Sequence, residues 1–313
     1  MLWLVLFFQL PGLGPVDLTP DDIALSPSGK IIARHRNTVA VYNSNLHLLS
    51  KIDSPRSLQV LFVGETPAVS SFKDKSLLLL REDLEQPQRV THFFPRFSCD
   101  LGDGTLLALP WPKAIDESSF TISLNNSVHA NEGVLVLVTL DQKELSWTPG
   151  KKVAPLSQEQ KNVYFNHKAF WAVGNPGRFY LFQASHNYYD EIIEGEHLAR
   201  HQMDLPGWVP QSYDLNALRG TFLKREYAAR LDEAAFGHSR VLGAYRLENG
   251  FAVCYVGPNQ KLVETTQVAI FDDHSILTTV SEHHGMLFGT IGNTGYFLSP
   301  RGDGQEIYTV PLN

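Results

Sequence analysis

Residues 26–46 read SPSGKIIARHRNTVAVYNSNL: a polar turn ending in glycine, an apolar run, a second polar turn and another apolar run. Turn residues between two runs rich in β-branched and aromatic side chains are typical of a β-hairpin. The same order of polar turn and apolar run occurs six times along the chain. The turns are Ser26–Gly29, Gly64–Thr66, Gly102–Gly104, Gly174–Gly177, Glu248–Gly250 and Gly292–Gly295. A hairpin that recurs at intervals of roughly 40 residues or more predicts a radial or solenoid array of sheets.

Six units of short apolar segments can be laid out around these turns, each bounded by Gly, Pro, Asn or Ser. The units span residues 22–53, 54–93, 96–153, 162–205, 239–281 and 284–313. The sixth unit is one strand short, and residues 15–19 can supply it, because pairing the first strand with the last blade removes an open sheet edge. We therefore predict an all-β fold, a six-bladed β-propeller with four-stranded blades, as a single domain over residues 15–313.

One segment departs from the β pattern. Residues 213–236 carry apolar side chains at helical spacing, with Asp214 suited to cap the N-terminus and Gly237 suited to end the helix. We predict a helical insertion here, between blades four and five.

The run Ser26–Leu46 and the fourth unit, around residues 178–204, resemble the six-bladed β-propellers of the NHL, TolB and YWTD type. The resemblance covers nearly all of the chain after residue 15, and it is architectural. Propellers of this kind include binding modules, scaffolds, lactonases and lyases. The resemblance therefore implies the fold and leaves the function open.

The charge balance and the N-terminus narrow the setting in which the protein works. A net charge of −7 disfavours a sequence-general nucleic-acid binder, which usually carries a basic excess. Residues 1–14 read MLWLVLFFQLPGLG; the apolar run is too short to span a bilayer, but it matches a secretory signal segment. We predict export to the periplasm or the extracellular space, with an apolar strand as the alternative, because a basic n-region is missing. We expect no transmembrane span and a monomer.

Motifs for catalysis or metal binding are weak. His197 and His201 are four residues apart, which suits a shared metal on a helix, but on a strand they are too far apart. The sequence has no nucleophile elbow, P-loop or dinucleotide fingerprint. We interpret Cys99 and Cys254 as two separate buried thiols, with a disulfide as the alternative. We predict no catalytic residue, no metal ligand and no cofactor.

A finer repeat places basic side chains just before the first strand of several units. Residues that enter the innermost strands of a propeller tend to meet at one mouth of its channel, and a cationic mouth on an acidic protein attracts anionic ligands. The predicted ligand-binding residues are Arg56, Arg96, His238, Arg240, His283 and His284. The alternative is that these side chains pair with acids such as Asp22, Asp53 or Asp100 and only join neighbouring blades.

The function we expect is that of an exported binding or scaffold module. It would present a loop-rich face or the channel mouth to a protein or a small anionic ligand. The alternative is a hydrolase or lyase with its active site in the central channel, where several blades could hold a metal. A third class is a structural part of an envelope or surface assembly, with the predicted helix 216–235 as its partner site. Three or more convergent carboxylate, amide or imidazole groups would favour the enzyme.

Overall fold

The computed structural model describes residues 8–9, 19, 21–54, 57–81, 86–90, 93, 95–110, 134–155, 170–210, 237–258, 265–301 and 304–312. Within these ranges every regular element is a β-strand, and no helix there is long and apolar enough to cross a membrane. The helical insertion predicted at 213–236 lies outside the described residues, as does Arg56.

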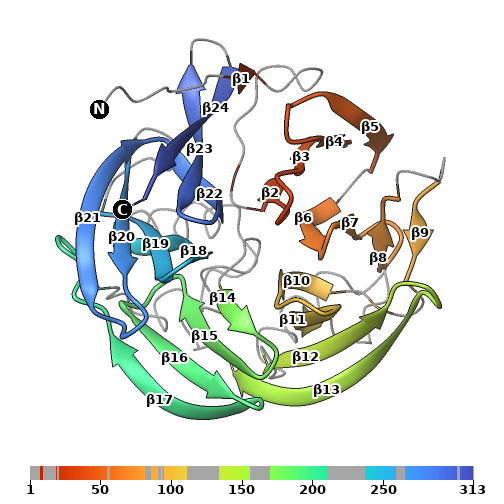
Figure 1. The fold of residues 1–313 in the computed structure, drawn as a ribbon. Helices are drawn as coiled ribbons and strands as arrows, with labels where there is room; N and C mark the ends of the chain where they lie inside the picture. The colour runs from red at the N-terminus through yellow and green to blue at the C-terminus, as the bar shows by residue number, and fades with distance from the viewer. Residues whose placement is uncertain are drawn as a thin grey trace, which may run out of the picture.

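The strands form six antiparallel four-stranded sheets arranged as blades around a central axis (Figure 1). Blades one to five are consecutive groups of four, β2–β5 to β18–β21, and blade six combines β22–β24 with β1. The strands are β1 (Phe8–Gln9), β2 (Ile23–Leu25), β3 (Ile31–His35), β4 (Thr38–Tyr42), β5 (Leu48–Asp53), β6 (Ser57–Val63), β7 (Thr66–Ser71), β8 (Ser76–Leu79), β9 (Gln88–Arg89), β10 (Pro95–Asp100), β11 (Thr105–Pro110), β12 (Val134–Asp141), β13 (Ser146–Pro155), β14 (Phe170–Asn175), β15 (Arg178–Gln183), β16 (Tyr188–Ile193), β17 (Glu196–Gln202), β18 (Arg240–Leu247), β19 (Gly250–Val256), β20 (Thr265–Phe271), β21 (Leu277–His284), β22 (Met286–Ile291), β23 (Thr294–Arg301) and β24 (Gly304–Pro311). The predicted six-bladed architecture is confirmed.

Blade six is closed by the N-terminus, which Figure 1 shows as the red β1 beside the blue β24. Phe8 pairs with Ile307 and Gln9 with Glu306. Closure by an N-terminal strand is confirmed, but the closing residues are 8–9 and not 15–19, so they fall inside the segment that resembles a signal sequence.

Each of the six turns recognised in the sequence joins the first and second strands of one blade. Gly250 illustrates why the turns need glycine. Its φ is +124°, and a Cβ atom there would lie 1.9 Å from the carbonyl oxygen of Phe271. Only glycine fits this backbone, so a local sequence signal decides where the hairpin turns.

The hydrophobic core lies between neighbouring blades. One cluster joins blades one and two around Val41 and Phe62, and similar clusters fill the other interfaces. The outermost strand β21 instead alternates between more and less exposed residues, as a half-solvated strand does. Cys99 and Cys254 are both buried and are not joined in a disulfide, which confirms the prediction of two separate thiols.

Candidate functional site in the central channel

The innermost strands β2, β6, β10, β14, β18 and β22 lie around the central axis (Figure 1). Residues of these strands line a cavity of about 550 Å³. Its apolar walls include Phe62, Trp171 and Phe288, all nearly fully buried. Polar and charged side chains occur near the ends of the inner strands. They are Asp100, Tyr245, Arg246, Glu248 and Thr290. The cavity thus combines apolar and polar lining, and its volume falls in the range of small-ligand sites, about 300–1,000 Å³.

One mouth of this cavity is formed by the six hairpin turns. Lining residues continue from the inner strands into the turns at Pro27, Gly174 and Gly292. Hydrogen bonds join neighbouring turns: the backbone N–H of Ser28 donates to Glu65 at 2.9 Å, and the N–H of Glu248 donates to Asn293 at 3.1 Å. These bonds join the turns of blades one and two and those of blades five and six. We call the end of the cavity at the hairpin turns the hairpin mouth.

Asp100 is the last residue of β10 and lies at the hairpin mouth. Its carboxylate accepts the backbone N–H of Gly64 at 2.7 Å and of Gly102 at 3.1 Å. Burial raises the pKa of Asp100 above its usual value, and the nearby charge of Asp103 adds to this, while the two N–H bonds oppose it. The two bonds hold the carboxylate in a fixed orientation and leave each oxygen with capacity for a further partner.

Tyr245 contributes a phenol to the wall of the cavity. Its hydroxyl donates to the backbone carbonyl of Leu287 at 3.1 Å. The ring lies over Gly243, where a Cβ atom would come within 2.4 Å of it. Burial raises the pKa of Tyr245 well above its usual value, so the phenol stays neutral at ordinary pH.

The residues predicted for a cationic mouth do not gather at this cavity in the part of the chain that the structure describes. Arg240 is buried and begins β18, whereas the lining of that strand starts at Ala244; His238 precedes it. His283 and His284 end β21, the outermost strand of blade five. Arg96 lies on β10, its side chain is outside the described residues, and Arg56 is outside them altogether. A cationic mouth therefore stays a prediction.

His283 lies at the interface between blades five and six. Its ring stacks on Phe297 of β23 with centroids 4.4 Å apart, and its Nε2 is 2.7 Å from the hydroxyl of Ser281. Burial lowers the pKa of His283 below its usual value. The contacts of this histidine are those of a packing residue.

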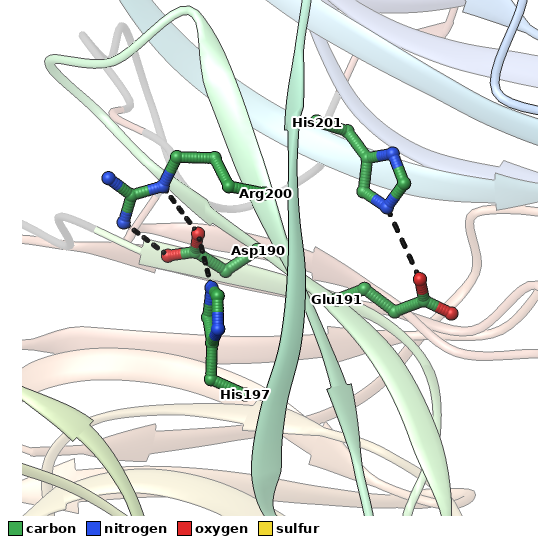
Figure 2. Close-up of polar contacts among 5 residues, drawn as sticks. All are labelled: Asp190, Glu191, His197, Arg200 and His201. Carbon is green, nitrogen blue, oxygen red and sulfur yellow. Dashed lines mark hydrogen bonds and ion pairs between the residues drawn. The ribbon is translucent and has the colours of Figure 1, made fainter.

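Two buried carboxylates on β16 of blade four form the clusters drawn in Figure 2. Asp190 accepts from Arg200 Nε at 2.7 Å and lies 3.1 Å from His197 Nε2. Glu191 accepts from Arg178 Nε at 2.8 Å and lies 3.2 Å from Nε2 of the second histidine, His201. Each carboxylate is thus held by one arginine and one histidine, as buried charges require.

The two histidines of β17 do not share a site. A register shift in the pairing of β16 with β17 falls between Glu191 and Ile192, so His197 and His201 lie on opposite faces of the sheet (Figure 2). Each ring nitrogen Nε2 faces its own carboxylate. Among the described residues, no three His, Cys, Asp or Glu side chains are grouped as a metal site would require.

The sequence prediction missed two groups of residues, the paired carboxylates of β16 and the acids at the cavity. The sequence contains a signal for each group. Adjacent acids within the apolar strand YYDEII, residues 188–193, indicate buried and paired carboxylates. At the cavity, Asp100 and Glu248 stand just before or at the start of a hairpin turn. That position is the end of an innermost strand, opposite to the end that the predicted cationic mouth used.

Comparison with known proteins identifies the architecture and no family. No protein-family model matches the sequence, and no curated protein matches it. A solved member of the DUF4221 family from Bacteroides vulgatus is similar at 10% identity with a TM-score of 0.56, covering 97% of this chain and 95% of that one. An exported-protein candidate from Bacteroides fragilis is similar at 11% identity and a TM-score of 0.57, covering 99% and 95%.

A third similar structure is an enzyme. The luciferin-regenerating enzyme matches at 9% identity with a TM-score of 0.53, covering 99% of this chain and 96% of that one. Identities of 9–11% show the propeller fold alone, because unrelated functions share it. Assignment to the NHL, TolB or YWTD type stays a prediction.

Proposed function

We propose that this chain is an exported binding module that takes a small ligand into the central cavity through the hairpin mouth. The observation that carries the proposal is the cavity itself: about 550 Å³, lined by apolar side chains such as Trp171 and Phe288 and by polar side chains. Such a space accommodates a drug-sized molecule and orients it with few polar contacts.

The proposal of export rests on the apolar segment 1–14 and on the likeness to the Bacteroides fragilis protein named as an export candidate. The segment also supplies β1, so cleavage near Gly12–Gly14 would remove the strand that pairs with β24.

The hydrolase or lyase alternative stays a prediction. The charged lining that the structure describes consists of Asp100, Glu248 and Arg246. An active site would need further convergent groups around an open position.

Occupancy of the cavity can be tested by filling it. Ala172 lines the cavity and is partly exposed, so Ala172→Phe places a ring in the space. Ala199→Phe, on the outermost strand of the same blade, is the matched control. A library of small cations, neutral compounds and anions is screened by ligand-observed NMR, with circular dichroism to verify the fold of each variant.

We expect compounds that bind the wild type and the Ala199→Phe variant and fail to bind Ala172→Phe. If no compound binds the wild type, or if binding to Ala172→Phe is unchanged, the proposed cavity function is wrong. Should Ala172→Phe fail to fold, Thr290→Phe on β22 offers a second obstruction of the same space.

A further inference from the structure

The charged side chains that line the cavity carry one net negative charge. Two carboxylates, Asp100 and Glu248, and one guanidinium, Arg246, line the cavity. Carboxylates at the rim of a low-dielectric space attract a cation and repel an anion.

The aromatic side chains that line the cavity favour a ligand with an apolar part. Phe62, Trp171 and Phe288 each have at most 5% of their surface exposed, and they line the cavity on blades two, four and six. Aromatic walls favour a ring or a similarly compact apolar body, and their faces also favour a nearby cation.

We propose that the ligand is a small organic amine, with its protonated nitrogen at Asp100 and Glu248 and an apolar body against Trp171 and Phe288. This inference rests on the proposed function and adds the ligand class to it. A protonated amine loses water on entering the cavity, and a carboxylate with free lone pairs offsets that loss. Asp100 is suited to this because its two backbone hydrogen bonds fix its position.

Three probes with one body and different charge separate this class from others. Phenethylamine is the cation, 2-phenylethanol the neutral analogue and phenylacetate the anion, and binding of each is measured by calorimetry or NMR titration. The variants are Asp100→Asn, which removes the charge, and Asp103→Asn, the matched control on an exposed turn residue outside the lining. Glu248→Gln, at an exposed position, is the second test variant if Asp100→Asn does not fold.

We expect phenethylamine to bind most tightly and phenylacetate most weakly. Loss of the charge at Asp100 or Glu248 weakens phenethylamine about tenfold and leaves 2-phenylethanol unchanged, while Asp103→Asn has little effect. If phenethylamine does not bind, or binds no better than the other two probes, the amine class is wrong. The proposed cavity function still stands in that case if any library compound binds the wild type and fails to bind Ala172→Phe. The two proposals can therefore fail separately.

Discussion

The side-chain amide of Gln59, on the innermost strand of blade two, pairs with the backbone of Ser98, on the innermost strand of blade three. Ser98 N–H donates to Gln59 Oε1 at 2.7 Å, and Gln59 Nε2 donates to the Ser98 carbonyl at 2.9 Å. Both residues are buried and line the cavity. The amide thus completes the inner edge of β10, which has no neighbouring strand on that side.

Gln59→Ala leaves two buried backbone groups without partners. We expect it to lower the free energy of unfolding by about 2–4 kcal/mol, measured by urea denaturation. Gln267→Ala is the matched control, because its amide bonds Glu282 at the surface; its loss should stay near 0.5 kcal/mol or less. Equal losses for the two variants would show that the inner-edge pairing does not stabilise the fold.

Removal of β1 tests the closure of blade six. Deleting residues 1–14 uncovers the edge of β24 beside Ile307, and we expect the melting temperature to fall by about 2–4 °C for each kcal/mol lost. Deleting residues 1–6 keeps Phe8–Gln9 and is the control. A melting temperature that is the same in both truncations would mean that β1 does not hold the ring together.

The sequence predicted those features that depend on local chemistry. A turn such as that at Gly250 needs a backbone conformation that glycine alone adopts, so the six hairpins and the blade count follow from the residues. Closure of the last blade by an N-terminal strand was predicted, but the residues that form this strand were not. The register of Phe8 against Ile307 is set by a contact between the two ends of the chain, which the local sequence does not reveal.

The site was harder to predict because it depends on which end of each inner strand borders the cavity. Arg240 begins β18 and Glu248 directly follows its last residue. Of these two residues, only Glu248 lines the cavity. The basic residues of the predicted cationic mouth stand near the starts of inner strands or on β21, whereas Asp100 and Glu248 stand at the hairpin ends of β10 and β18. Likewise, the bulge that separates His197 from His201 arises from pairing with β16, which spacing alone does not reveal.

The two thiols should differ in reactivity because only one borders the cavity. Cys99 lines the cavity, whereas Cys254 is fully buried on β19 and burial raises its pKa to about 11. The thiolate is the reactive form, so a small reagent such as methyl methanethiosulfonate should modify Cys99 first in the folded protein. Peptide mass spectrometry over a time course measures both rates, with Cys99→Ser and Cys254→Ser as controls. Faster modification of Cys254 would contradict the assigned accessibility.

His283 should make the protein less stable in mild acid. Burial lowers its pKa in the folded state below the ordinary value of 6.5, so as the pH falls through that value the unfolded chain gains a proton that the folded chain does not. The contribution to stability is therefore complete above about pH 6.5 and decreases as the pH falls toward the folded-state pKa. His283→Phe removes the titrating group and keeps an aromatic ring against Phe297.

We expect the free energy of unfolding to drop between about pH 6.5 and 5 in the wild type, and to drop less in His283→Phe, as followed by urea denaturation at each pH. His284→Phe changes the adjacent exposed histidine and serves as the control, which should behave as the wild type does. The Phe297 stack makes the comparison direct, since both the native imidazole and the substituted phenyl ring can occupy the same position. If His283→Phe loses as much stability in acid as the wild type, then protonation of His283 is not what links pH to the packing of blades five and six.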